Sequence, residues 1–445
     1  MLRRGFRNTF LTPRFFMALT GLVVGFVLAY FAGRGLSVLQ WLFAALVLGT
    51  FVDLLLLYGS KGRISARRSL PDKLSNGDEN PIGIRMVNSY LFAVRYQLID
   101  ELPFQFQKRD FLRSGLLGPG RDRELTYTVR PVERGVYRFG QVRVLVGSPL
   151  GLVRRRYNFD ADQEVPVYPS FLQLRKYELL AASNRLFELG LKRIRRIGHT
   201  MEFEQIKEYT PGDDVRNLNW KATAKHSRLM VNQYQDEKSQ PIYSAIDTGR
   251  VMQMPFEGLS LLDYAINAAL VLSRIAIKKQ DKAGVFTFNR RVENRVAADR
   301  RSSQMQRILE TLYNIKTDFA ESDFARLYID LKRNLNQRSL LLLYTNFETL
   351  DALHRQLPYL QALQRQHLLV VIFFENTELL EFTGREATTV REVFQQTIAR
   401  KFIFEKRQIV RELQRYGIQA LLTRPEDLTV NALNKYLEIK ARGLI

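Results

Sequence analysis

The stretch His367–Asn376, HLLVVIFFEN, is apolar without interruption from Leu368 to Phe374. Such a run, ending in polar turn residues, is typical of a β-strand with both faces covered. Four similar runs occur in the C-terminal half: Ile242–Asp247, Ala283–Asn289, Ser339–Asn346 and Ile418–Pro425. Amphipathic stretches that fit helices lie between and after them: residues 259–279, 303–313, 323–335, 350–366, 390–416 and 427–442. This alternation predicts a doubly wound, parallel α/β sheet over residues 240–445.

Polar residues directly follow two of these predicted strands. Asp247 and Thr248 end the first, and Thr345 and Asn346 end the strand at 339–346. Ligands of open α/β sheets bind outside the carboxyl ends of the strands, so we expect these four residues to contact a partner. In the competing interpretation, Asp247 only caps the following helix or accepts hydrogen bonds from local amides.

Residues 70–170 follow a different pattern, with short alternating runs separated by turn residues. The runs are PIGIRMVN, LFAVRYQLID, LTYTVRPV, VYRFGQVRVLVG and VPVYPS. Alternation with period two suits antiparallel strands with one buried face. Gly and Pro residues mark turns between the runs, for example at Gly118–Gly120 and Ser148–Gly151. We therefore predict a small antiparallel β-sandwich.

Two long apolar segments lie within residues 1–69. FFMALTGLVVGFVLAYFA, residues 15–32, carries no charge, and its 18 residues nearly span a hydrocarbon core of roughly 30 Å. VLQWLFAALVLGTFVDLLLLY, residues 38–58, follows after a short connection and contains one charged residue, Asp53. Together they predict a transmembrane helical hairpin. We do not expect a cleaved signal peptide, because no small-residue cleavage site separates the two segments.

The Lys and Arg counts set the expected orientation. Four basic residues precede the first segment, four follow the second within ten residues, and the connection holds only Arg34. By the positive-inside rule, we expect a multi-pass protein of the inner (cytoplasmic) membrane with both termini in the cytoplasm. Asp53 could be a functional acid, but we favour a structural role in which it snorkels toward Lys61 and Arg63.

The formal net charge of +22 raises anionic lipid and nucleic acid as further ligands. One basic run, Lys192–Arg196, falls in a predicted helix from Leu172 to Ile197, within a linking segment at residues 171–239. It could grip phosphates, but no aromatic residues are interleaved to stack bases, so we do not expect nucleic acid to bind. A solvated charged face is the simpler interpretation. Cysteine is absent, which excludes disulfides, thiolate metal sites and cysteine nucleophiles.

The segment Gly198–Glu237, GHTMEFEQIKEYTPGDDVRNLNWKATAKHSRLMVNQYQDE, resembles the signature of a bacterial family called domain of unknown function 58. The residues that carry the resemblance are Phe203, Glu204, Tyr209, Pro211, Gly212, Asp213, Asp214, Arg216, Asn219, Trp220, Lys221, Ala224 and Leu229. Upstream, RPVERGVYRFG and GSPLGLVRR are similar to that family's preceding strands, and its members commonly begin with a membrane hairpin. We assign structural roles within the signature: the GDD forms a turn, Arg216 pairs with a carboxylate, and Trp220 packs between domains.

The resemblance implies that the α/β region is similar to von Willebrand factor A domains. Such domains often bind a divalent cation through an Asp-x-Ser-x-Ser turn, with a Thr and an Asp from other loops, which are hard oxygen ligands. Here the turn reads DTGRV, so Gly249 and Val251 stand in place of the serines, and Asn346 stands where an acid is often found. We therefore expect neither a metal nor another cofactor.

The resemblance also implies scaffolding or adaptor work at the membrane, since family members are often encoded beside MoxR-type ATPases. The sequence contains no Gly-x-Ser-x-Gly elbow, phosphate loop, dinucleotide-binding turn or paired-His spacing, so no residue is assigned a catalytic role. We expect a non-enzymatic adaptor whose partners are the lipid bilayer and another protein, with a MoxR-type ATPase as the candidate. Two alternatives stay open: a metal-dependent hydrolase that uses Asp213, Asp214 and Asp247, and a binder of anionic lipid or nucleic acid through residues 192–196.

Overall fold

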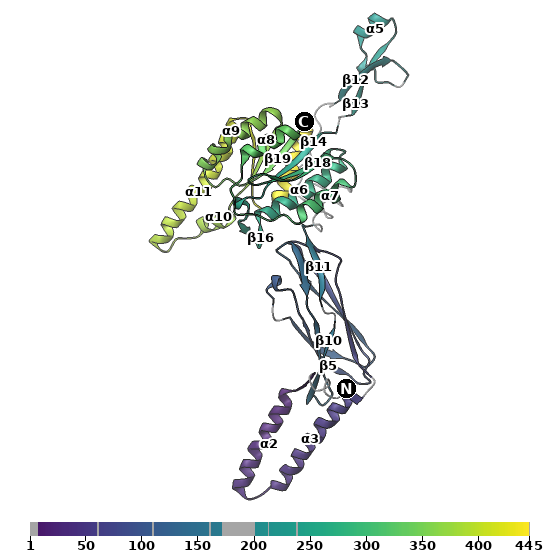
Figure 1. Cartoon of the computed structure of the whole chain (residues 1–445), viewed down its shortest axis with the longest axis vertical. Coiled ribbons are helices and arrows are strands. Elements are labelled where there is room, and N and C mark those ends of the chain that lie inside the picture. Colours follow the sequence, from purple (N-terminus) through teal and green to yellow (C-terminus); the bar gives the residue numbers. More distant parts are fainter. Residues whose placement is uncertain are drawn as a thin grey trace. The chain divides into compact units, whose positions relative to one another are not determined.

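The computed structural model describes residues 8–59, 62–108, 111–159, 162–170, 201–211, 213–236 and 239–444. The chain divides into two compact units, Met1–Tyr168 and Pro169–Ile445 (Figure 1). Each unit has its own apolar core.

The first unit contains two long helices, α2 (Pro13–Ala32) and α3 (Leu36–Gly59), which lie side by side as a hairpin (Figure 1). Both are long and apolar enough to cross a membrane. Thr12 caps α2, and Pro13 takes the first helical position, where its missing N–H has no intrahelical partner to lose. The predicted segments, 15–32 and 38–58, lie within these helices.

The remainder of the first unit consists of strands in three sheets around one core, with a 3₁₀ turn, η1 (Phe104–Phe106). The strand orders are β1-β10-β9-β5-β6, β2-β4-β7 and β3-β11-β8. The strands are β1 (Thr9–Leu11), β2 (Ile64–Ser69), β3 (Leu74–Ser75), β4 (Asn80–Asn88), β5 (Val94–Asp100), β6 (Leu112–Leu117), β7 (Asp122–Val129), β8 (Gly135–Phe139), β9 (Val142–Gly147), β10 (Val153–Phe159) and β11 (Gln163–Tyr168). Alternating burial along β4 places Ile82, Ile84 and Met86 in the core, as the sequence pattern predicts.

The sheets include more of the chain than residues 70–170. Strands β1 and β2 lie before residue 70, on either side of the helical hairpin, and β1 pairs antiparallel with β10. β1 has three residues, too few for a readable alternation. The run VYRFGQVRVLVG forms two strands, β8 and β9, instead of one. The pairing of β11 with β3 is parallel, whereas the other pairs in these sheets are antiparallel.

The second unit contains a six-stranded sheet in the order β18-β17-β14-β19-β20-β21. Its strands are β14 (Pro241–Asp247), β17 (Lys282–Phe288), β18 (Val292–Asp299), β19 (Leu340–Tyr344), β20 (Leu368–Phe374) and β21 (Gln419–Thr423). Every residue of β14, β19 and β20 is buried, as the uninterrupted apolar runs predict. The five predicted strands pair parallel, as expected, but the sheet has a further edge strand, β18, which was not predicted and runs antiparallel to β17. Only a short turn joins them, and such a turn permits only antiparallel neighbours.

Helices cover both faces of this sheet (Figure 1). On one face α6 (Leu261–Lys278) packs against α7 (Gln304–Tyr313) and α12 (Leu428–Ala441). On the other, α8 (Phe324–Asn334), α9 (Leu350–Gln366) and α11 (Val390–Arg415) share a core with alternate strand residues. The sequence pattern predicted all six helices. It did not predict α10 (Thr377–Gly384), which precedes α11 and is short.

The signature segment forms a β-hairpin of β12 (Met201–Glu208) and β13 (Met230–Asp236), which encloses η3 (Val215–Asn217) and α5 (Trp220–His226). Three small elements follow β14: η4 (Arg250–Met252), β15 (Pro255–Phe256) and β16 (Leu259–Ser260). The whole of the predicted helix at 172–197, with the basic run Lys192–Arg196 within it, lies outside the described residues, and so does Gly212.

Candidate partner-binding site

Asp247 and Thr345 meet at the carboxyl edge of the sheet, as their positions after adjacent parallel strands predict. Asp247 is the last residue of β14, and Thr345 follows β19, its neighbour. The Thr345 hydroxyl donates a hydrogen bond to Asp247 Oδ2 over 2.7 Å. The topology of the sheet therefore brings together two residues that are distant in sequence.

Asp247 is fully buried and accepts hydrogen bonds from three donors of the protein. Besides Thr345, its donors are the Ser322 hydroxyl and the backbone N–H of Gly249, the latter over 2.8 Å. Burial raises the pKa of Asp247, and the charge of Asp318 acts in the same direction, while the three donors oppose the rise. Ser322 was not a candidate from the sequence, because it belongs to a loop before α8 without a motif of its own.

Gly249 is the position where the resemblance would place a metal-binding serine. A Cβ atom there would lie 2.3 Å from Ser322 Oγ and 2.9 Å from the Ala320 carbonyl oxygen. The Ser322 hydroxyl therefore occupies the space that a side chain at position 249 would need. Within the described residues, no group of three or more His, Asp or Glu side chains gathers to hold a metal ion.

Thr248 is held inside the protein by hydrogen bonds to the backbone. It is buried, and both its N–H and its hydroxyl donate to the Phe288 carbonyl, over 2.8 and 3.1 Å. Its own carbonyl accepts the N–H of Asp318. These bonds fix the turn after β14 against the end of β17. The side chain of Thr248 is thus not available to a partner in this conformation, contrary to our expectation of direct contact.

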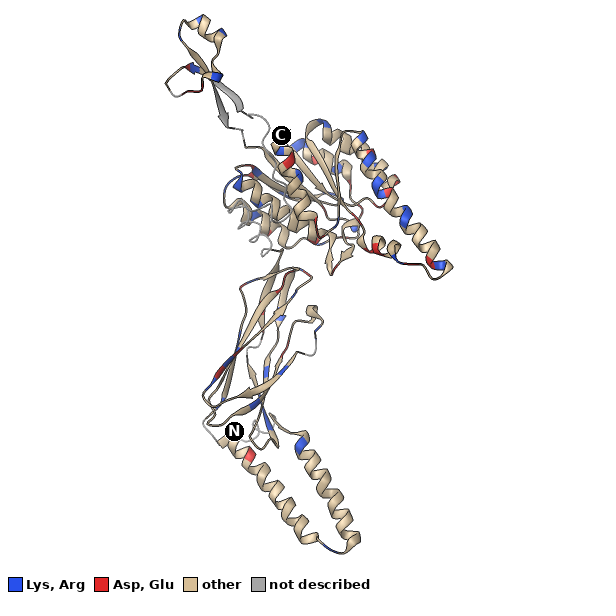
Figure 2. Ribbon diagram, turned by 180° about the vertical axis from the view of Figure 1, so that it is seen from behind, with Lys and Arg blue, Asp and Glu red and all other residues tan. Residues whose placement is uncertain are grey.

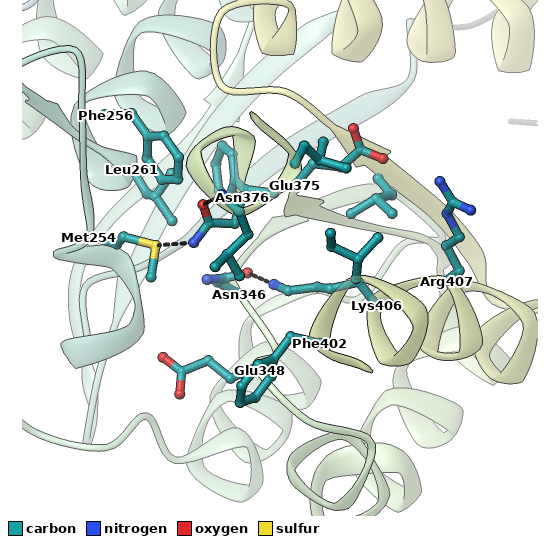
Figure 3. A pocket seen from close by; sticks show the side chains of 15 residues that line it. Met254, Phe256, Leu261, Asn346, Glu348, Glu375, Asn376, Phe402, Lys406 and Arg407 are labelled. Carbon is teal, nitrogen blue, oxygen red and sulfur yellow. Dashed lines mark hydrogen bonds between the residues drawn. The ribbon is translucent and has the colours of Figure 1, made fainter. Parts of the chain in front are cut away.

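Asn346 lines a cavity at the same edge of the sheet as Asp247. Its side-chain oxygen accepts a hydrogen bond from the Lys406 ammonium on α11 (Figure 3). The cavity measures about 270 Å³ and has a largely apolar lining that includes Phe256, Leu379 and Phe402. A smaller cavity of about 170 Å³ adjoins Asp247 and Arg250. Asn346 lines both hollows.

Lys406, like Ser322, is a residue of this site that sequence reasoning missed. Burial lowers the pKa of its ammonium to about 8, while the charge of Glu348 opposes the change. The ammonium lies 5.8 Å from the centre of the Phe373 ring. Its place at spacing i, i+4 from Phe402, on the core-facing side of a long amphipathic helix, was the available sequence signal.

Helix α11 also carries an exposed apolar row beside this cavity. Val390, Phe394 and Ile398 are 74%, 68% and 55% exposed, and Phe402 continues the row into the cavity wall. These residues are four apart, so they lie along one side of the helix. The first half of α11 extends past the sheet in Figure 1. Large exposed apolar groups that gather in this way are typical of interaction surfaces.

The signature residues hold the β12–β13 hairpin through local bonds. Asp213 accepts from Lys207 Nζ over 2.9 Å and from the N–H and hydroxyl of Thr210, and Lys207 is the main cause that lowers the pKa of Asp213 to about 2. Asp214 caps η3 by accepting the N–H of Arg216. Asn219 caps α5 by accepting the N–H of Ala222. The turn-forming role predicted for the two aspartates agrees with these bonds.

Two of the signature predictions differ from the structure. Arg216 forms no ion pair in the described part of the chain, because Asp213 is engaged by Lys207 and Asp214 by backbone N–H. Trp220 is 68% exposed and does not serve as a packed anchor here. It begins a short helix, α5, in which no residue is buried. Asp213 and Asp247 have separate sets of partners, so the triad proposed for a hydrolase does not assemble among the described residues.

Comparisons with known proteins identify relatives of this chain. A family model described as "Protein of unknown function DUF58" matches residues 205–398. The Bacillus subtilis (strain 168) protein named "Uncharacterized protein YeaD" is 28% identical over 235 residues, which are 51% of this chain and 58% of that protein. The chain thus spans little more than half the length of this curated relative.

The solved structures that resemble this chain match only about a quarter of its length. The CARDB domain of a Pyrococcus furiosus protein, solved in complex with di-metal ions, matches 24% of this chain and 93% of its own, with 14% identity and a TM-score of 0.17. The seventh PapD-like domain of human CEP192 matches 23% of this chain and 84% of its own, with 13% identity and a TM-score of 0.17. The sequence matches support the family assignment for the matched region, which begins within the signature hairpin: residues 205–398 are those of a DUF58 protein of unknown function.

Proposed function

We propose that this protein is a membrane-anchored, non-catalytic adaptor that binds another protein through its C-terminal α/β region. The observation that carries the proposal is the exposed apolar row on α11, formed by Val390, Phe394, Ile398 and Phe402. The same side of the helix continues to Ile409 and Leu413, which are buried against the sheet. The row is therefore an extension of a core-facing stripe beyond the edge of its own domain, and a partner could cover it.

The partner site we propose is the row together with the neighbouring cavity of about 270 Å³. Aromatic side chains next to an apolar cavity are the features that dominate protein–protein binding energy. Asp247 and Thr345 support the loops of this edge from beneath, since their side chains are buried and bonded to each other. Asn346 and Lys406 supply a polar contact inside the cavity. In this proposal the α/β region is similar to a von Willebrand factor A domain without its metal turn.

The anchor in this proposal is the helical hairpin α2–α3. Strand β1 precedes α2, strand β2 follows α3, and both pair within the sheets of the first unit. The two connections to one folded domain support a hairpin that enters and leaves the bilayer on the same side. The basic residues before and after the hairpin favour the cytoplasm for that side, and the inner membrane for the location.

A MoxR-type ATPase is the partner we propose, because the family resemblance implies that such ATPases are encoded nearby. The test is a binding titration of the full-length chain in detergent against a purified MoxR-type ATPase from the same genome. We expect saturable binding, and a loss of roughly tenfold or more in affinity for the double variant Phe394→Ser with Ile398→Ser, because truncated hot-spot side chains lose on the order of 2 kcal/mol.

Phe319→Ser is the matched control, since Phe319 is an exposed aromatic residue outside α11. This variant should bind as the wild type does. An ATPase that does not bind the wild-type chain would contradict the proposed partner. Equal binding by the wild type and the α11 double variant would contradict the proposed surface.

A further inference from the structure

We propose that Arg14 and Arg95 form a binding site for the phosphate of an anionic phospholipid headgroup, where helix α2 joins the β-sheets of the first unit. This inference rests on the proposed anchoring of the hairpin in a bilayer. Its basis is that two guanidinium groups converge on Gly151, which lies in the turn between β9 and β10.

The convergence is measured from Gly151. A Cβ atom on this residue would lie 3.1 Å from Arg14 Nη1 and 3.7 Å from Arg95 Nη1. Both guanidinium groups are thus within a few ångströms of one point. Gly151 also has a φ of +77°, which disfavours other residues. A tight turn without a side chain leaves room for both arginines above it.

The two arginines repel each other unless an anion lies between them. Within the described part of the chain, neither guanidinium forms a hydrogen bond or an ion pair. Asp53 is the acidic residue beneath this turn: its Oδ2 accepts the N–H groups of Leu152 and Val153, over 2.8 and 3.3 Å, and its buried Oδ1 has no hydrogen-bond partner among the described residues, so neither oxygen is paired with an arginine there. Converging guanidinium groups with free donors favour a phosphate, whose oxygens accept several hydrogen bonds at once.

Arg95 also borders a groove on the outer side of the sheet. The groove measures about 420 Å³, and its lining includes Arg154, Leu116 and Leu145 but no acidic residue. Arg154 donates to the side chain of Gln97 over 2.8 Å and has no carboxylate partner among the described residues. Lys and Arg positions gather at this end of the hairpin in Figure 2. The local charge is therefore positive beyond the two arginines.

Arg14 lies at the end of the apolar segment of α2, where a helix that spans a bilayer meets the lipid phosphates. Thr12 fixes the start of the helix to the turn, since its N–H donates to the Leu152 carbonyl over 3.0 Å and its hydroxyl to the Gly151 carbonyl over 2.7 Å. Arg14 lies in the first turn of α2, and the uncharged segment begins at the next residue. Basic residues at such a boundary contact headgroups.

Apolar neighbours favour a lipid over free phosphate. Leu116 in the groove and Leu150 in the turn are both more than half exposed. A phospholipid could place its phosphate on the arginines and its acyl chains against these leucines and α2. Inorganic phosphate would gain only the first of these two contacts.

The test is native mass spectrometry of the full-length chain released from detergent micelles, with added phosphatidylglycerol or phosphatidylcholine. We expect the wild type to retain phosphatidylglycerol in preference to phosphatidylcholine. The double variant Arg14→Gln with Arg95→Gln should lose that preference by about tenfold or more, since each basic residue near an anionic lipid surface contributes severalfold. A charge-matched control, Arg130→Gln with Arg138→Gln, removes two arginines that contact Gly77 and Glu164 instead. It should keep the preference.

Three results would overturn the inference. They are a wild type without preference between the two lipids, an equal loss in the control variant, and binding of inorganic phosphate at the same site with the affinity of the lipid. None of these results depends on the protein partner. Failure of membrane anchoring is measured separately, by whether the chain stays in the membrane after an alkaline wash.

Discussion

Lys406 shows how one side chain can conflict with its surroundings. Its ammonium lies against the apolar cavity wall, and its partner is the neutral Asn346 side chain. Burial that lowers a lysine pKa to about 8 means that the charged form destabilises the folded protein. A destabilising residue of this kind is typical of a position kept for binding.

We predict that the titration of Lys406 makes the free energy of unfolding rise with pH between about 8 and 10.5. The ordinary pKa of 10.5 applies to the unfolded chain, so in that window the unfolded state binds more protons than the folded state. Below pH 8 both states are charged, and the cost of burial is fully present. Lys406→Met should therefore stabilise the protein by about 1 to 3 kcal/mol at pH 7, with a smaller gain at pH 10.

Thermal melting of the two proteins at pH 7 and pH 10 measures this effect. Lys401→Met is the control on the same helix, because Lys401 is largely exposed beside Glu405. Its melting temperature should follow that of the wild type at both pH values. A gain for Lys406→Met that does not change with pH would refute the explanation by burial.

Gly249 and Ser322 show why a single substitution would not restore the Asp-x-Ser-x-Ser motif in this chain. A serine at 249 would match the expected metal turn, but its Cβ would overlap Ser322 Oγ. In this chain two hydroxyl groups and one amide donate hydrogen bonds to Asp247. The donors come from separate parts of the chain, so the turn sequence DTGRV by itself shows only one of them.

At the scale of elements, the last turns of α3 belong to the β-sheet domain. Leu57 is buried in its core, and Tyr90 donates to the Leu57 carbonyl over 3.1 Å. Asp53 is buried and accepts the amides of Leu152 and Val153. A structural role for Asp53 agrees with these bonds, but its donors belong to the turn after β9, and it forms no ion pair with Arg63 in the described part of the chain. The part of α3 before Asp53 rises about 25 Å, which is close to the thickness of a hydrocarbon core.

We predict that Asp53→Ala loosens this junction. Without the carboxylate, the N–H groups of Leu152 and Val153 lose their acceptor in a buried place, at a cost of about 1 to 3 kcal/mol. Amide hydrogen exchange at these two residues should accelerate by roughly tenfold or more. Asp53→Asn keeps one acceptor oxygen and should have a smaller effect.

Thr50→Ala is the appropriate comparison for the Asp53 variants. Thr50 donates to the Leu46 carbonyl within α3 and has no bond to the turn. Its removal should leave exchange at Leu152 and Val153 unchanged. Unchanged exchange in Asp53→Ala would show that the carboxylate does not hold the turn.

At the scale of the whole molecule, the central prediction is that the hairpin anchors the chain. Alkaline carbonate washing of membranes should leave the full-length protein in the pellet. Arginines placed in the middle of both helices, Val24→Arg with Leu48→Arg, should release it, since each costs about 2.5 to 3.5 kcal/mol at the centre of a bilayer. Val24→Leu with Leu48→Val should remain in the pellet. Full-length protein in the soluble fraction would refute anchoring, and cleavage by protease outside sealed cells would refute the cytoplasmic orientation.

The sequence alone determined features that depend on local periodicity. Strands β14, β19 and β20 are readable because both of their faces are buried, so the whole run must be apolar. The hairpin helices are readable for a similar reason, since a segment without charges has few other stable environments. The meeting of Asp247 with Thr345 followed from parallel topology. Short strands such as β1, the edge strand β18 and helix α10 carry too little pattern to be read.

Only the tertiary structure decided what surrounds each candidate residue. Ser322 at Asp247, Lys406 at Asn346, Leu152 at Asp53, and Arg14 with Arg95 above Gly151 are contacts between loops or elements far apart in the chain. Local periodicity gives the face on which a residue lies, but such contacts depend on how separate elements pack and on which side chain fills the remaining space. For that reason the sequence identified the edge of the sheet and the helical hairpin, and the structure identified the exposed row on α11 and the arginine pair.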